Sequence, residues 1–130
     1  MKISCTIILL LLVTSTLGCQ TRGGELAKRS SRLLEGGLSI LESHQESPEQ
    51  APEAFRVFME KQQSEIEELS GIATSIADDK AEITTARRIF LEKLKTLQPR
   101  LDSIAAAYGS NKALIEEFNQ IAEKALRLSP

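Results

Sequence analysis

The sequence predicts an all-α protein, folded as a small up-down bundle of about four helices. Its apolar residues recur at intervals of three and four, and the sustained apolar-polar alternation of half-buried strands is absent. Aromatic residues make up only 4% of the chain, so leucine, isoleucine and alanine supply most of the core. Seven glycines and four prolines in 130 residues are too few for a loop-rich or collagen-like chain. The alternative fold is a three-helix arrangement with one long, kinked, coiled-coil-like helix.

The first predicted helix covers about residues 25–43, and Gly36 and Gly37 lie inside it. Because glycine in a helix interior costs about 1 kcal/mol relative to alanine, this pair indicates either a hinge or a close crossing of two helices. The linker that follows, 44–52, is polar and ends in Pro52, which suits the first turn of a second helix. The apolar positions of the first helix are Leu26, Leu33, Leu34, Leu38 and Leu41.

A heptad pattern extends from residue 55 to residue 108 and predicts a coiled-coil-like seam. Lys80 and Arg87 occupy a positions of this pattern, where apolar residues are expected. Either one very long helix runs from about residue 52, or a tight turn at 78–80 joins two antiparallel helices. We favour the turn because Asp79 can cap a new helix and Glu82 completes a capping box. The apolar and neutral seam positions are Phe55, Met59, Gln62, Ile66, Leu69, Ala73, Ile76, Ile83, Phe90, Leu94, Leu97, Leu101, Ile104 and Tyr108.

Pro99 lies inside the helix that follows this turn. Proline removes one backbone donor and clashes with the preceding turn, yet the heptad pattern continues beyond it, so we expect a kinked helix. Gly109 then ends the helix, and Ser110 and Asn111 supply N-cap residues for a last helix. The apolar stripe of the last helix consists of Leu114, Ile115, Phe118, Ile121, Ala122 and Ala125.

The first 20 residues predict an export signal. Lys2 is followed by an uncharged, mostly apolar run over 3–18, which has the shape of a signal peptide and is short for a membrane-spanning helix. At residues 16–19, Thr-Leu-Gly-Cys, the segment resembles the lipobox of bacterial lipoprotein precursors. In that family a small residue precedes a cysteine that is acylated and becomes the new N-terminus. The resemblance covers residues 1–20 only, and the first two residues of the tetrapeptide depart from the usual motif.

The resemblance implies cleavage between Gly18 and Cys19 and a palmitate-type lipid on Cys19. It divides the chain into a removed signal peptide (1–18), a lipidated tether (19–24) and a helical domain (25–130). Beyond this covalent lipid, we expect no cofactor and no metal. The alternatives are an ordinary secretory signal that leaves Cys19 free, and an uncleaved anchor. Gln20 resembles the Gram-negative class that is exported to the outer membrane, because inner-membrane retention is commonly signalled by aspartate there. The expected location is the bacterial cell envelope, facing the periplasm if the cell is Gram-negative.

The residue types and motifs of the chain give little support for a catalytic function. The one histidine, His44, lies in the polar linker, where we expect a solvated imidazole rather than a metal ligand. A haem bound by His44 and Met59 is also weakly supported, because Met59 fits an ordinary core position. No Gly-x-Ser-x-Gly motif or phosphate-binding loop is present, and the carboxylates over 65–79 are spaced like a solvated helix face. The net charge of -2 argues against nucleic acid as a partner. We predict that the protein is not an enzyme.

Two surface features are candidate contact sites. Basic residues near the anchor can each gain on the order of 1 kcal/mol from anionic headgroups, or they form an ordinary solvated face. Phe55 and Phe58 bracket Arg56 near the start of the second helix, and Phe58 is either an exposed anchor for a partner or part of a broad core stripe. The basic residues in question are Arg22, Lys28, Arg29 and Arg32.

Together these features predict a membrane-anchored envelope lipoprotein that acts by protein-protein contact. It would serve another envelope protein as an adaptor, assembly factor or structural component, and unsatisfied helical faces are also compatible with self-association. The alternative is a carrier that binds an apolar ligand or lipid within the bundle. A cofactor-bearing bundle is the third and weakest hypothesis.

Overall fold

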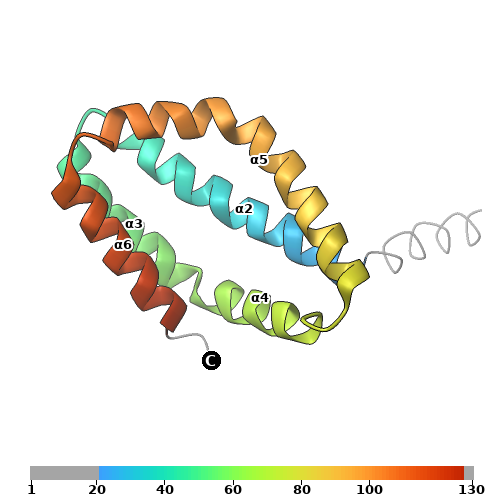
Figure 1. Cartoon of the computed structure of the whole chain (residues 1–130). Coiled ribbons are helices and arrows are strands. Elements are labelled where there is room, and N and C mark those ends of the chain that lie inside the picture. Colours follow the sequence, from blue (N-terminus) through green and yellow to red (C-terminus); the bar gives the residue numbers. More distant parts are fainter. Residues whose placement is uncertain (1–20, 128–130) are drawn as a thin grey trace, which may run out of the picture.

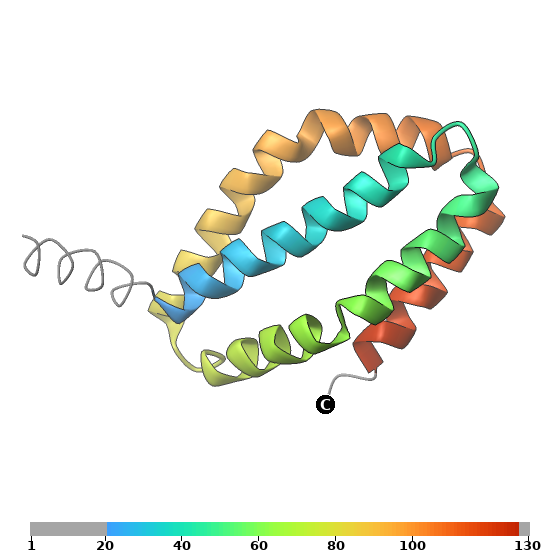
Figure 2. The ribbon, with the colours of Figure 1, turned by 180° about the vertical axis from the view of Figure 1, so that it is seen from behind.

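The fold is an all-α bundle, as the sequence predicts. The structure, a computed structural model, describes residues 21–127, and within them it contains five α-helices, one short 3-10 helix and no strand (Figure 1). The chain direction alternates between the long helices, and α2 lies at the centre, in contact with α3, α4 and α5 (Figure 2). The elements are α2 (Arg22–Ser43), η1 (Pro48–Gln50), α3 (Ala51–Lys61), α4 (Gln63–Ser75), α5 (Lys80–Tyr108) and α6 (Lys112–Arg127).

Helix α2 begins three residues before the predicted start, so residues 22–24 of the predicted tether are helical. Two acceptors explain the early start. The side chain of Thr21 accepts a hydrogen bond from the Gly24 N–H at 3.0 Å, and the carboxylate of Glu82 accepts one from the Gly23 N–H at 2.6 Å. These are backbone donors that a helix leaves unpaired at its first turn.

The glycine pair inside α2 marks a close helix crossing and no hinge. The helix continues through Gly36 and Gly37, which face the rings of Phe58 and Phe55 on α3. A Cβ atom at Gly36 would lie 2.9 Å from the Phe58 ring, closer than such contacts come. The space that glycine leaves is therefore filled by an aromatic ring of the neighbouring helix.

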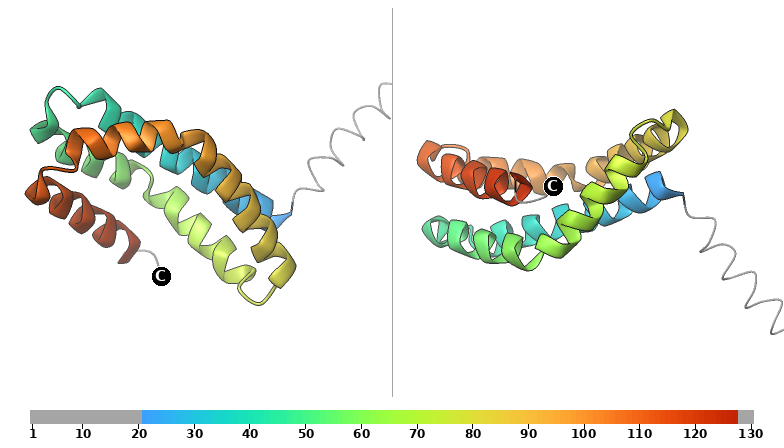
Figure 3. Two further views of the ribbon diagram at one scale, coloured as in Figure 1. Left: turned by 45° about the horizontal axis from the view of Figure 1, so that its top comes forward. Right: turned by 90° about the horizontal axis from the view of Figure 1, so that it is seen from below.

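The second predicted helix is broken at Gln62, which the sequence analysis did not predict. Gln62 has φ -91° and ψ 5°, outside the helical region, and separates α3 from α4. Backbone bonding resumes at once, because the Ile66 N–H donates to the Gln62 carbonyl at 2.9 Å. The break allows α3 to run alongside α6, while α4 crosses α2 obliquely (Figure 3).

The predicted turn between the antiparallel helices is confirmed, but the predicted capping box is not. The Asp79 carboxylate accepts hydrogen bonds from the Ala81 and Glu82 N–H groups at 3.1 and 3.2 Å. Glu82 does not return to the Asp79 N–H, which instead donates to the Ile76 carbonyl at 2.9 Å. The Glu82 carboxylate instead accepts a hydrogen bond from the Gly23 N–H in the first turn of α2. One side chain therefore connects the starts of α2 and α5.

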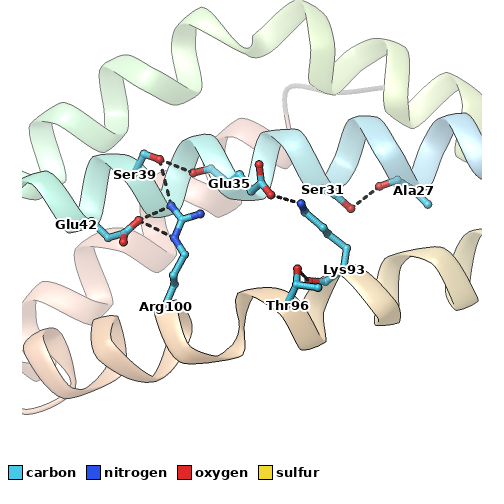
Figure 4. Close-up of polar contacts among 8 residues, drawn as sticks. All are labelled: Ala27, Ser31, Glu35, Ser39, Glu42, Lys93, Thr96 and Arg100. Carbon is cyan, nitrogen blue, oxygen red and sulfur yellow. Dashed lines mark hydrogen bonds and ion pairs between the residues drawn. The ribbon is translucent and has the colours of Figure 1, made fainter.

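Helix α5 continues through Pro99, as predicted, and follows a curved course along α2 in Figure 1. Polar groups bridge the two helices along one side of their contact (Figure 4). Lys93 forms an ion pair with Glu35, and Arg100 donates to Glu42 at 3.0 Å and to Ser39 at 3.3 Å.

The chain forms an aromatic end where α2 and α5 finish and α3 and α6 begin. Tyr108 is only 4% exposed, and its hydroxyl donates to the Leu41 carbonyl at 2.6 Å. The ring of Phe118 packs edge-on against Phe55 and Tyr108, with centroid distances of 5.5 and 5.8 Å. The predicted helix boundary beside this cluster is confirmed, because the Asn111 side chain accepts from the first turn of α6. The aromatic end consists of Leu41, Ala51, Ile104, Tyr108, Leu114 and Phe118.

The opposite end of the bundle, here called the N-terminal end, is built differently. The start of α2, the end of α4 and the start of α5 meet there, whereas α6 packs against α3 and does not reach it (Figures 1 and 3). Lys80 opens α5 at this end, which accounts for a charged residue at a seam position. The N-terminal end therefore has one helix fewer than the aromatic end to cover its apolar side chains.

Candidate functional site

Arg29 is the one residue of the predicted basic group that the fold uses internally. Its guanidinium binds Glu25, Glu65 and Glu68 at distances between 2.5 and 2.9 Å, and its side chain is 20% exposed. The hydrogen bonds from Arg29 lower the pKa of Glu65 below its ordinary value, against a smaller opposing effect of burial. Because three carboxylates share this cation, Arg29 holds α4 onto α2 and has little free charge for a membrane surface.

The other three basic residues of this group, Arg22, Lys28 and Arg32, are exposed on α2. Lys28 and Arg32 lie together beside a hollow of about 200 Å³, where α5 contributes Lys93. Lys93 was not predicted, because it lies far along the chain and only the α2–α5 pairing brings it here. The Lys93 ammonium lowers the pKa of Glu35 by hydrogen bonding, so this acid stays charged and offsets one of the three cations. The hollow is lined by Lys28, Ser31, Arg32, Glu35, Ile89 and Lys93.

Phe58 and Arg56, the candidate partner contacts, point to different surroundings. Phe58 is half-buried against Gly36 of α2 and stacks with Phe55 at a centroid distance of 6.5 Å. The structure thus places Phe58 in the broad core stripe. Arg56 is exposed and forms ion pairs with Glu53 and Glu60 on its own helix. A role in partner contact stays a prediction for both.

Arg56 lies on the rim of a groove between α3 and α6 with a volume of about 450 Å³. Met59 and Ile121, which are half-buried, are taken as its apolar floor, and the charged residues of its lining are exposed and form the rim. Figure 1 shows the two helices running side by side in the same direction. The groove is lined by Pro52, Glu53, Arg56, Met59, Glu60, Gln63, Glu117, Gln120, Ile121, Lys124 and Ala125.

A second groove, of about 380 Å³, opens at the N-terminal end between α2, α4 and α5. Its lining is almost entirely apolar, with Arg87 as the one charged residue. Ala73, a predicted seam position, is exposed at this groove and not buried, because no fourth helix covers it. The groove is lined by Leu26, Ala27, Ser30, Ala73, Ile76, Ala77, Ile83, Ala86, Arg87 and Phe90.

His44 departs from its predicted solvated state. Its Nδ1 atom lies 2.8 Å from the Ile40 carbonyl and 3.3 Å from the Ser43 hydroxyl, and the residue is half-buried at the end of α2. Within residues 21–127, no three histidine, cysteine, aspartate or glutamate side chains gather as a metal site. The arrangement described so far contains two open grooves, one between α3 and α6 and one between α2, α4 and α5.

Several of the sequence-based expectations concern residues outside the described part of the chain. Gly18 and Cys19, the expected cleavage and lipidation residues, lie outside the described residues. None of the helices between residues 21 and 127 combines the length and the apolar character needed to cross a membrane. No known protein family, curated protein or solved structure matches the chain.

Proposed function

We propose that this chain is a bacterial envelope lipoprotein, anchored through a lipid on Cys19, that acts by binding another envelope protein. The anchor is supported by the export signal and the lipobox-like residues 16–19. A lipid at this position attaches the bundle to one membrane surface without spanning it. In a Gram-negative cell the expected surface is the periplasmic face of the outer membrane.

The observation that carries the contact function is the groove between α3 and α6. It is open, its floor contains Met59 and Ile121, and its rim is charged. An apolar floor with a polar rim between two helices is the surface into which amphipathic helices dock. We therefore propose a helix of an envelope protein as the partner, with its apolar face against Met59.

The position of the groove fits a tethered adaptor. Helices α3 and α6 lie on the side of the bundle away from the first turn of α2 (Figures 1 and 2). The lipid would be attached two residues before Thr21, the cap of α2. A bundle held by its N-terminal end would thus leave the groove accessible to a partner.

Site-specific crosslinking in cells tests this proposal. A photoreactive phenylalanine replaces the exposed Gln120 in the groove or, as a matched control, the exposed Gln98 on α5. We expect one envelope protein to crosslink through position 120 and not through position 98. The adduct should disappear with Met59→Glu, which places a charge on the groove floor, and with the untethered Cys19→Ser chain.

Two outcomes would overturn the proposal. One is equal crosslinking at positions 120 and 98, because the groove would then have no preferred partner. The other is an adduct that consists only of a second copy of this chain, which would make the groove a self-association surface. The mass of the mature N-terminal peptide tests the anchor separately, since acylation adds the mass of the lipid to Cys19.

A further inference from the structure

The groove at the N-terminal end has the lining of a site for a hydrocarbon chain. Its walls are formed by larger apolar side chains such as Leu26, Ile83 and Phe90. The last turn of α4 and the residues after it line the groove with the buried Ile76 and with two small, exposed residues, Ala73 and Ala77, and the space between the three helices stays unfilled. The volume of about 380 Å³ falls in the range of about 300 to 1,000 Å³ that small-molecule sites occupy.

Arg87 places a positive charge beside this otherwise apolar groove. The heptad pattern places it at a seam position, in line with the apolar residues Ile83 and Phe90, and the structure places it at the edge of the groove. Among the described residues Arg87 forms no ion pair, whereas Arg88, its neighbour on α5, pairs with Glu92. An exposed cation beside an apolar groove is complementary to a ligand with a hydrocarbon chain and an anionic head.

The location of the groove indicates where such a ligand would come from. Leu26 and Ala27 lie in the second turn of α2, so the groove begins next to the point where the chain enters the bundle. On the proposed function, a lipid on Cys19 would hold this end at the membrane. Two extended residues span at most about 7 Å, which leaves the groove within reach of bilayer lipids.

We propose that the groove between α2, α4 and α5 takes one acyl chain of an anionic bilayer phospholipid, with Arg87 bound to the headgroup phosphate. The acyl chain lies against Leu26, Ile83 and Phe90, which are otherwise only half-buried. This site is open at the surface of the bundle and differs from the enclosed interior of a lipid carrier. The proposal rests on membrane attachment but not on the partner of the α3–α6 groove.

The test uses the full chain in lipid nanodiscs that contain a trace of photoreactive phospholipid. The probe carries a diazirine on its acyl chain and has either a phosphatidylglycerol or a phosphatidylcholine headgroup. After illumination, mass spectrometry maps the lipid-modified peptides. We expect adducts in the two peptides that contain residues 73–77 and 83–90, at least threefold more with phosphatidylglycerol than with phosphatidylcholine.

Two pairs of variants sharpen the test. Ala73→Phe fills the mouth of the groove from an exposed position and should reduce these adducts at least fivefold, whereas Ala106→Phe makes the same change at an exposed site on the far part of α5. Arg87→Gln should remove the preference for phosphatidylglycerol, and Arg88→Gln should keep it. Circular dichroism of each variant checks whether its helices are retained.

The proposal is overturned if adducts spread evenly over the exposed helices, or if Ala73→Phe has no greater effect than Ala106→Phe. Equal modification by the two headgroups in the wild-type chain would also overturn it, because both carry a phosphate and the site would then show no preference for a lipid with net negative charge. Adducts that appear only in the Cys19→Ser chain would show that the protein's own acyl group occupies the groove. An unmodified Cys19 together with specific adducts would reject the proposed anchor and keep the lipid site.

Discussion

The two ends of the bundle are stabilised by different interactions. At the aromatic end, four helices meet around Tyr108, and rings fill the space between them. At the N-terminal end, three helices meet, and polar contacts such as the Glu82 bond to Gly23 and the ion pairs of Arg29 hold them. Small residues there leave an apolar groove. The comparison indicates that ring packing closes one end, whereas polar contacts hold the other end and leave a groove open there.

The largest expected effect is at the aromatic end. Tyr108→Ala should lower the free energy of opening of this end by about 3 to 5 kcal/mol, because it removes a buried ring from between α5 and α6. Amide hydrogen exchange should show the loss in α6 and in the last turns of α5.

Tyr108→Phe is the matched control for this change. It keeps the ring and removes only the bond to the Leu41 carbonyl, so about 1 kcal/mol should be lost. If Tyr108→Ala costs no more than Tyr108→Phe, packing of the ring is not what stabilises this end.

An intermediate effect is expected at the N-terminal end. Gly23→Ala would place a Cβ atom 2.1 Å from the Glu82 carbonyl oxygen, so the starts of α2 and α5 must separate. We expect a cost of about 1 to 3 kcal/mol, with faster exchange in the first turns of α2 and α5 and unchanged exchange in α6.

Gly71→Ala provides the control, because no atom outside its own helix lies within 4 Å of the added Cβ. There the alanine should stabilise α4 by up to about 1 kcal/mol, through the lower entropy of the unfolded chain. Faster exchange throughout the molecule in Gly23→Ala would indicate that the two ends do not open independently.

The smallest expected effect is on the stability of the fold at acidic pH. Because Arg29 lowers the pKa of Glu65 below the ordinary value of 4.5, the pair stabilises the fold above that pH. This contribution is lost as the pH falls through the lowered pKa of Glu65, when the carboxylate takes up a proton. The thermal midpoint from circular dichroism should therefore fall in acid, and Glu65→Gln should flatten that fall. Glu67→Gln, on the exposed side of α4, serves as the control, and an equal flattening there would contradict the assignment to Glu65.

Much of the helix pattern was predictable because it depends on local chemistry. Asp79 and Asn111 accept hydrogen bonds from the first turns of their own helices, and the apolar spacing of α5 continues beyond Pro99. The break at Gln62 was missed because neither glycine nor proline marks it. The early start of α2 was missed because one of its acceptors, Glu82, comes from a different helix.

The candidate sites were less predictable. The basic residues of α2 were identified as a group, but the separation of Arg29 from Lys28 and Arg32 depends on where α4 and α5 pack. Similarly, Arg87 is an anomaly in the heptad pattern, and its place beside an apolar groove follows from the missing fourth helix at that end.

The sequence by itself determined the helical class, the turn before α5 and the start of α6, since spacing and capping act between residues close in the chain. It also contains the signal-like pattern of residues 1–20, on which the proposed location rests. Tertiary structure decided which charges are shared and which are free, which glycines meet a ring, and which end of the bundle is left open. Those properties depend on contacts between residues far apart in the chain, and the pairing of α2 with α5 and of α3 with α6 creates them.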